Sequence, residues 1–302
     1  MIKSYKKQLF IAPSSFNKKQ KIFLEIKKKR NLSIKFNPVQ KKLSENQILE
    51  YAKDATHIIA GTEKYSSAVV KKLKKLKYIF RLGSGIDNLD HKYLKLKKIK
   101  FQKSTVSLGK AVGELIIGLA LTNLRNICMH DSDMKKNLWK KYMGNLLYGK
   151  NFGIIGYGKI GRYLSKLAKS FGAKVIISDI KKFQNSDQKP LSFLLSNSDI
   201  ISVNANYNSF FILDKKRINK LKKNCILINT SRAELIDYDY LYKILKQKKI
   251  KSAALDVFNK EPYYGKFSKL NNVTLTPHIG SYAKEIRDLM EREALEKVIK
   301  NL

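Results

Sequence analysis

Short apolar segments alternate with helical patterns along nearly the whole chain, and this alternation limits the fold more than any other feature. In the first third, the apolar segments predict strands at 9–12, 32–36, 57–60, 78–82 and 99–102. Helical patterns occur between them, near 17–30, 44–53 and 65–76. Strands that are separated by helices assemble most readily into a parallel sheet covered on both faces. The first third therefore predicts an open α/β unit.

A second α/β unit begins near Phe152. Its predicted strands lie at 152–155, 174–178, 199–205, 225–229, 252–256 and 273–275. A crossover helix is expected from Lys159 to Phe171, and two further long helices are expected at 110–126 and 283–302. The 302 residues suffice for two domains of roughly 100–200 residues each. We therefore predict an α/β protein with two doubly wound parallel-sheet domains.

Composition and cysteine content exclude several other classes of protein. With 43% hydrophobic residues and no repeat or low-complexity tract, the chain is neither disordered nor a solenoid. The longest apolar stretch, 115–121, is far shorter than the roughly 20 residues that cross a bilayer, so no membrane partner is expected. The two cysteines form neither a disulfide framework nor a metal-ligand cluster. We expect a cytoplasmic protein without a bound metal.

A net charge of +38 raises the question of a nucleic-acid partner. Only eight of the 62 basic residues are arginines, although arginine is the residue that reads bases and clamps phosphates. The lysines are spread along the chain with many Ile, Asn, Tyr and Phe, which share AT-rich codons. We attribute the charge to genomic composition and expect no specific nucleic-acid partner. Salt-sensitive binding driven by the lysine excess is the alternative.

The glycine-rich segment GIIGYGKIG, residues 153–161, follows an apolar strand and opens a helix. In this context the G-x-G-x-x-G pattern binds a dinucleotide. The first glycine permits a tight turn, the second lets the backbone approach a pyrophosphate, and the third lets the helix pack on the strand. The helix N-terminus offers N–H groups to the phosphates. The predicted cofactor loop comprises Gly156, Tyr157, Gly158, Lys159, Ile160 and Gly161.

Asp179 ends the next predicted strand, 18 residues after Gly161. A carboxylate at this place hydrogen-bonds the adenosine ribose and repels a 2′-phosphate. Asp179 therefore favours NAD over NADP, although Lys181 and Lys182 nearby weaken that preference.

Three later strands are followed by polar side chains that carry candidate chemistry. The strand at 225–229 runs into Arg232, Glu261 follows the strand at 252–256, and the strand at 273–275 runs into His278. In an open α/β sheet, ligands bind beyond the carboxyl ends of the strands, so these groups can converge. The arginine fork is suited to a substrate carboxylate, and the histidine to proton exchange with a carbonyl or hydroxyl oxygen. The glutamate would orient the imidazole and stabilise its charged form.

Five segments together resemble the NAD-dependent D-isomer-specific 2-hydroxyacid dehydrogenases. They read RLGSGIDNLD at 81–90, GKNFGIIGYGKIG at 149–161, INTSRAELID at 228–237, AALDVFNKEP at 253–262 and LTPHIGS at 275–281. The resemblance implies hydride transfer between NAD(H) and a small anionic D-2-hydroxy acid or 2-oxo acid. It implies a flavodoxin-like substrate domain, residues 1–105 with 284–302, and a Rossmann NAD-binding domain, residues 106–283. A homodimer is also usual in this family.

The same resemblance implies residue roles. Arg232, Glu261 and His278 would be the catalytic trio. The implied substrate contacts are Gly83, Ser84 and Gly85, through backbone N–H groups, with Arg232 and His278. Beyond the glycine loop and Asp179, the implied cofactor contacts are Asn204, Thr230, Arg232, Asp256, His278 and Gly280.

The substrate stays open at this point. The segments IAPSSFNKKQ and HIIAGTEKYS resemble the phosphoglycerate dehydrogenase branch, which indicates 3-phosphoglycerate with Lys64 as the candidate phosphate ligand. No second arginine lies near 62–64, so a glyoxylate or hydroxypyruvate reductase is the alternative. A non-enzymatic regulator that senses NAD is a further alternative.

The chain departs from the family pattern in two loops. Asn206 stands where a turn proline is usual, and Asn204 replaces the usual residue two positions earlier. Ala233 and Glu234 stand where glycines commonly follow the arginine. We expect altered cofactor affinity from the first departure and a reshaped active-site rim from the second.

Overall fold

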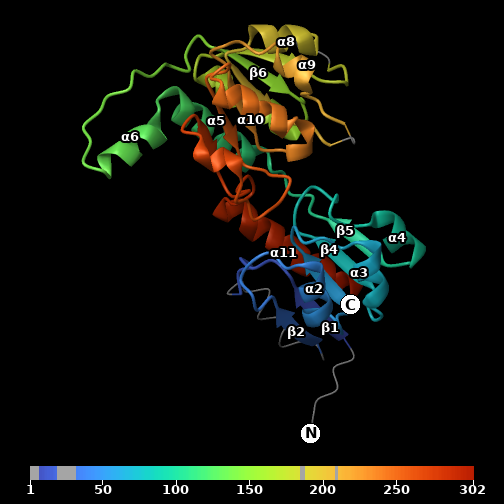
Figure 1. Ribbon diagram of the computed structural model, residues 1–302. Helices are drawn as coiled ribbons and strands as arrows, with labels where there is room; N and C mark the ends of the chain where they lie inside the picture. The colour runs from blue at the N-terminus through green and yellow to red at the C-terminus, as the bar shows by residue number, and fades with distance from the viewer. Residues whose placement is uncertain (1–6, 19–31, 184–187, 208–209) are drawn as a thin grey trace. The chain divides into compact units, whose positions relative to one another are not determined.

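The computed structural model describes residues 7–18, 32–183, 188–207 and 210–302. The chain divides into two units: unit 1 comprises Met1–Val106 with Ala283–Leu302, and unit 2 comprises Ser107–Tyr282 (Figure 1). Each unit is built on its own parallel sheet, which confirms the predicted fold class. The helix predicted near 17–30 lies almost entirely outside the described residues.

Unit 1 has a five-stranded parallel sheet in the order β2-β1-β3-β4-β5, which is the flavodoxin-like order. Its strands are β1 (Lys7–Ile11), β2 (Leu32–Phe36), β3 (His57–Ala60), β4 (Tyr78–Arg81) and β5 (Lys100–Lys103). Its helices are α2 (Glu45–Tyr51), α3 (Ser67–Lys72), α4 (His91–Leu96) and α11 (Lys284–Asn301). Short helices begin where the sequence supplies a cap: Ser44 caps α2, Ser66 caps α3 and Asp90 caps α4.

The C-terminal helix α11 belongs to unit 1 because of what it buries there. Met290, Ala294, Leu295 and Val298 form a buried stripe, and the helix packs against β3 and β4. Glu293 adds polar contacts, since its carboxylate accepts hydrogen bonds from the hydroxyl of Ser104 at 2.5 Å and from neighbouring backbone. These contacts return the end of the chain to the sheet formed by its beginning.

Unit 2 has a six-stranded parallel sheet in the order β11-β10-β9-β8-β6-β7. The strands are β6 (Asn151–Ile155), β7 (Lys174–Ser178), β8 (Ile200–Val203), β9 (Ile226–Asn229), β10 (Ser252–Leu255) and β11 (Val273–Leu275). An isolated parallel bridge between Ile177 and Gln188 adds one more position beyond β7. With that position included, the order is that of a Rossmann sheet with one further strand, β11, at the opposite edge.

Helices cover both faces of this sheet (Figure 1). They are α5 (Gly109–Leu124), α6 (Ile127–Met134), α7 (Lys159–Ser170), α8 (Leu191–Asn197), α9 (Lys215–Ile218) and α10 (Tyr238–Lys246), with short turns η1 (Ala233–Leu235) and η2 (Lys266–Lys269). In β9, Ile226 and Ile228 pack with α5 and α7, whereas Leu227 packs with α8 and α10. This alternation buries both faces and leaves the strand ends as the place for polar side chains.

Predicted and observed boundaries differ most at the helix predicted at 65–76, which is observed only as α3, Ser67–Lys72. They differ at β8 as well. The strand was predicted to run from 199 to 205, but it ends at Val203. The side chain of Asn204 bonds back to Ser202, and the backbone N–H of Asn204 still donates to the carbonyl of Ile155 at 2.7 Å.

Within the described residues, no single helix is long and apolar enough to cross a membrane, although α5 and α6 pass that test as a pair bent by 64°.

Candidate active site

The glycine loop joins β6 to α7 and has the shape that a pyrophosphate needs. Gly156 has φ of +93°, and a Cβ there would lie 2.8 Å from the backbone of Asn204. A side chain at Gly161 would overlap the carbonyl of Gly156, so the helix can pack this closely only with glycine. Gly158 is exposed and caps α7, and a Cβ there would meet open space. The loop therefore leaves the N-terminal N–H groups of a 12-residue helix accessible to a phosphate.

Asp179 follows β7 directly and is tied to the same loop. One carboxylate oxygen accepts from the N–H of Tyr157 at 2.6 Å, and the other accepts from the N–H of Lys181 at 2.8 Å. The carboxylate is half-buried, so it lies beside the glycine loop with part of its surface reachable. This is the geometry in which an acid can also receive ribose hydroxyls.

Thr230 supplies an independent sign that a ligand belongs at this edge. It follows β9, and its buried hydroxyl has no hydrogen-bond partner within the described chain. A buried hydroxyl without a partner is costly, and a bound polar group would satisfy it. The glycine loop, Asp179 and Thr230 thus fit a dinucleotide laid along the carboxyl ends of β6, β7 and β9.

The predicted pairing of Glu261 with His278 is present. Nδ1 of the imidazole lies 3.0 Å from Oε1 and 3.1 Å from Oε2 of the carboxylate. Oε1 also accepts from the N–H of Phe258 at 3.2 Å, which fixes the carboxylate from behind. With Nδ1 engaged, Nε2 is the nitrogen left for proton exchange with a substrate.

His278 sits in a strained turn that Asp256 holds. Its φ is +57°, a left-handed conformation that costs a non-glycine residue about 1–2 kcal/mol. Asp256 is fully buried and accepts from the hydroxyl of Thr276 at 2.6 Å and from the N–H groups of Ile279 at 2.8 Å and Gly280 at 2.9 Å. Burial raises the pKa of Asp256, and these hydrogen bonds oppose the rise.

These contacts change how three predicted cofactor contacts are understood. The family resemblance implies that Asp256, Gly280 and Asn204 contact the cofactor. In the structure, both oxygens of Asp256 are occupied by the turn that carries His278, and the N–H of Gly280 is one of their donors. Asn204 likewise bonds back to Ser202. Sequence reasoning missed this bracing role of Asp256, because it depends on a turn 20 residues further along the chain.

Arg232 follows β9 by three residues and stands at the same carboxyl edge. Its guanidinium donates to the carbonyl of Ser231 at 2.7 Å, and its side chain is half-buried. The turn is held by Asn229, whose side-chain amide donates to the carbonyl of Arg232 at 2.9 Å. The structure thus places Arg232, Glu261 and His278 after β9, β10 and β11, which are neighbouring strands.

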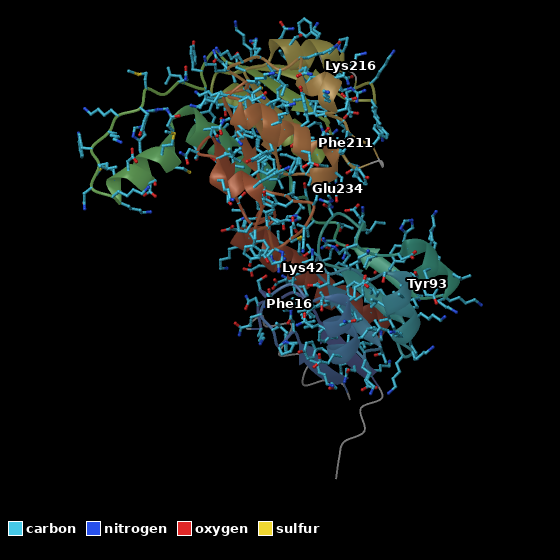
Figure 2. The ribbon with its side chains drawn as sticks, in the orientation of Figure 1. Phe16, Lys42, Tyr93, Phe211, Lys216 and Glu234 are labelled. Atoms are coloured by element: carbon cyan, nitrogen blue, oxygen red, sulfur yellow. The ribbon has the colours of Figure 1, made fainter. Side chains whose placement is uncertain are left out.

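The atypical loop after β8 lies beside the turn that carries Glu234. The N–H groups of Ile212 and Leu213 both donate to the carbonyl of Leu235, at 2.8 and 2.9 Å. Figure 2 labels Phe211 and Glu234, which are exposed side chains from these two segments. The segment that follows the first departure from the family pattern therefore lies next to the turn that carries the second.

In unit 1, the loop Gly83–Gly85 follows β4, and buried polar groups support it. Gly83 has φ of +152°, and a Cβ there would overlap the guanidinium of Arg81. Arg81 donates to the carbonyl of Leu82 and, at 3.0 Å, to Asn88. Sequence reasoning missed Arg81, although a charged residue at the end of an apolar strand was a usable signal.

Comparison with known proteins places the chain in one family. The family model for the NAD binding domain of D-isomer specific 2-hydroxyacid dehydrogenases matches residues 117–280. The glyoxylate reductase of Pyrococcus horikoshii is 31% identical over 282 residues, which cover 87% of this chain and 83% of that protein. The D-3-phosphoglycerate dehydrogenase of Methanocaldococcus jannaschii is 35% identical over 274 residues, 86% of this chain and 52% of that protein.

Solved structures agree. The D-lactate dehydrogenase of Aquifex aeolicus, solved with NAD and lactic acid, has a TM-score of 0.81 and 26% identity, and the match covers 97% of this chain and 94% of that one. With the family model and the curated relatives, this match shows both the reaction class and the cofactor. The chain belongs to the NAD-dependent D-isomer-specific 2-hydroxyacid dehydrogenases, enzymes that transfer a hydride between NAD(H) and a 2-hydroxy acid or its 2-oxo acid.

Proposed function

We propose that this enzyme reduces a small, unphosphorylated 2-oxo acid of the glyoxylate or hydroxypyruvate type. The observation that carries the proposal is the buried carboxyl group of Glu63, just after β3, which accepts from the N–H of Gly61 at 2.7 Å. Between residues 60 and 65 the single cation is the exposed Lys64. A segment with a buried acid and one solvated lysine is poorly suited to a phosphate, which arginine forks bind best.

The shares of the relatives that the chain matches support the same substrate assignment. The glyoxylate reductase is matched over most of its length, whereas the D-3-phosphoglycerate dehydrogenase is matched over about half. We assign unit 1 as the substrate domain because the family model for the NAD binding domain matches residues of unit 2. Of the loop Gly83–Gly85, we propose the N–H groups of Ser84 and Gly85 as ligands of the substrate carboxylate, since the N–H of Gly83 donates to the carbonyl of Arg81 at 2.9 Å. Unit 2 carries the cofactor.

The proposed chemistry divides between three side chains. The bound cofactor supplies the hydride to the carbonyl carbon. Nε2 of His278 donates a proton to the carbonyl oxygen, and Glu261 at Nδ1 stabilises the charged imidazole before that transfer. Arg232 holds the substrate carboxylate and polarises the carbonyl, since its planar fork matches a carboxylate in two hydrogen bonds.

The test is NADH oxidation with glyoxylate, hydroxypyruvate, 3-phosphohydroxypyruvate and pyruvate. We expect kcat/KM for glyoxylate or hydroxypyruvate to exceed that for 3-phosphohydroxypyruvate by about tenfold or more. A phosphorylated substrate that wins, and loses its advantage in Lys64→Gln, would overturn the substrate assignment. NADH binding without turnover of any 2-oxo acid would instead favour the regulator alternative.

We also propose that the enzyme is a homodimer, formed through the arm at residues 127–148. Figure 1 shows this arm, α6 and the segment after it, extending away from the sheet of unit 2. Most of its large hydrophobic side chains are exposed, including Trp139 at 79% and Met143 at 94%. Exposed apolar patches of this kind mark protein–protein contacts.

Light scattering tests the dimer directly. One chain has a mass of 34.8 kDa, and the wild type should have twice that mass. The double variant Trp139→Ser, Met143→Ser should be monomeric. Tyr264→Ser changes an equally exposed aromatic side chain outside the arm and should stay dimeric. A monomeric wild type would contradict the proposal.

A further inference from the structure

Buried hydrogen bonds begin at the turn that carries Arg232. Asn229, the last residue of β9, is fully buried. Its side-chain amide donates to the carbonyl of Arg232 at 2.9 Å and to the hydroxyl of Tyr238 at 3.1 Å, while its Oδ1 accepts from the N–H of Ser231 at 3.1 Å. Both donor hydrogens and the acceptor of this amide are therefore used.

Tyr238 carries the connection to the next strand end. It is the first residue of α10, is buried, and its hydroxyl donates to the carbonyl of Val257 at 3.0 Å. The peptide bond between Val257 and Phe258 also contains the N–H of Phe258, which donates to Oε1 of Glu261 at 3.2 Å. Glu261 then contacts Nδ1 of His278. An unbroken series of hydrogen bonds thus leads from the Arg232 turn to the imidazole.

The Tyr238 hydroxyl is the donor in its hydrogen bond to Val257. Burial raises the pKa of Tyr238, so the hydroxyl keeps its proton and acts as the donor to Val257. A peptide bond whose carbonyl accepts a hydrogen bond has a more polarised N–H, and neighbouring hydrogen bonds strengthen one another in a buried site. The Tyr238 hydroxyl therefore strengthens the bond from Phe258 to Glu261.

We propose that Tyr238 is a positioning residue for the reaction: through the Val257–Phe258 peptide bond it keeps the Glu261 carboxylate on Nδ1 of His278. This inference rests on the proposed function, because it takes Glu261 and His278 as the acid that serves the substrate. Tyr238 is buried and acts through these groups. Without its hydroxyl, the carbonyl of Val257 loses a donor and Glu261 is held less firmly.

The chain offers a matched control in the same aromatic cluster. The rings of Tyr238 and Tyr242 both meet Phe267 edge-on, with centroids at 5.4 and 5.7 Å. The hydroxyl of Tyr242 has no hydrogen-bond partner among the described residues. Tyr242→Phe therefore removes the same atom from the same cluster and leaves the series intact.

The experiment compares Tyr238→Phe with Tyr242→Phe by kinetics and by NMR of ¹⁵N-labelled histidine. We expect Tyr238→Phe to lower kcat for 2-oxo acid reduction about tenfold, a part of what a general acid contributes. Its KM and its NADH affinity should change far less. The ¹⁵N shifts of His278 should move from a single Nδ1–H tautomer towards a mixture, because the carboxylate that selects that tautomer has loosened. Tyr242→Phe should leave both readouts at wild-type values.

Two results would overturn the inference: wild-type kcat and tautomer in a folded Tyr238→Phe, or equal effects in both variants. If Tyr238→Phe does not fold, 3-fluorotyrosine at position 238 keeps the ring and supplies a stronger donor. The ¹⁵N shifts of His278 should then move away from their wild-type values, and no change would again overturn the inference. The tautomer readout needs no substrate. Failure of the proposed function, in which no 2-oxo acid is reduced, is therefore distinguishable from failure of this one.

Discussion

Each unit carries a glycine loop after a buried parallel strand, but charges of opposite sign support the two loops. In unit 2, the carboxylate of Asp179 accepts from the N–H of Tyr157 within the loop after β6. In unit 1, the guanidinium of Arg81 donates to the carbonyl of Leu82 within the loop after β4. Asp179 therefore occupies one N–H of its loop, whereas Arg81 occupies a carbonyl and leaves the N–H groups of Ser84 and Gly85 for an anion. The N–H of Gly83 donates to the carbonyl of Arg81 at 2.9 Å.

The groups presented at the carboxyl ends of the strands also differ between the two units. The edge of unit 2 presents partly exposed side chains that are paired for proton exchange, with His278 against Glu261. The edge of unit 1 presents backbone, and its polar side chains Glu63 and Arg81 are buried behind it. This difference fits our proposal that unit 2 performs the chemistry and that unit 1 binds the substrate, so substitutions in the two units should affect different kinetic constants.

The substitution His278→Gln is the strongest test of this division of roles between the two units. Because the proposed proton donor is lost, kcat should fall by about 10²–10⁴-fold, with NADH affinity kept. His91→Gln, an exposed histidine on α4 of unit 1, should leave kcat unchanged. Steady-state turnover and NADH fluorescence titration measure both quantities. Near-normal turnover in His278→Gln would remove the proton-transfer role and with it the division between the two edges.

The second substitution, Gly83→Ala, addresses unit 1. A Cβ at a φ of +152° is strained and would overlap the guanidinium of Arg81, so the loop must shift. Misplacing a substrate-binding group by about 1 Å costs about 100-fold, and we expect that loss mainly as a higher KM for the 2-oxo acid. Gly118→Ala on α5, where nothing lies within 4 Å, is the control and should be neutral. An unchanged KM would show that the loop does not bind the substrate.

Sequence reasoning succeeds where one residue and its strand suffice. Arg232, Glu261 and His278 lie at neighbouring strand ends, as the sequence predicted, because each follows a predicted strand, and the shape of the glycine loop was predicted because its spacing dictates the backbone conformation. The left-handed turn at His278 and the bracing role of Asp256 were not foreseen. They depend on residues from two strand ends that meet only in the folded chain. Tyr238 was not foreseen either, because the sequence pattern at the start of α10 does not distinguish it from the other apolar positions there.

A smaller effect is expected in unit 2 from the substitution Asp179→Ala, which should change the preference between NADH and NADPH. Asp179→Ala removes an acid that repels a 2′-phosphate, so the preference for NADH over NADPH should fall about tenfold or more. Asp239→Ala removes an exposed acid on α10 and should leave the preference unchanged. The ratio of kcat/KM for the two cofactors is the measurement. An unchanged ratio in Asp179→Ala would mean that another group sets the preference and that Asp179 serves only to hold the Tyr157 N–H.

The smallest expected effect separates the two units by pH. His57 on β3 is buried, with Nδ1 at 2.9 Å from the hydroxyl of Thr56 and Nε2 at 2.9 Å from the carbonyl of Asn301 on α11. Burial lowers the pKa of His57 below its usual 6.5, so the folded chain favours the neutral ring. The stability that this ring contributes is complete above about pH 6.5, and it is lost as pH falls from there towards the lower folded pKa. Acidification from pH 7.5 to 5.5 should therefore lower the hydrogen-exchange protection factors, which correct for the pH dependence of chemical exchange, in β3 and α11 more than in the sheet of unit 2. His57→Gln should abolish that difference and change Tm by no more than about 5 °C. An equal loss of protection in both sheets would mean that the acid response comes from groups other than the histidine that joins the first unit to the end of the chain.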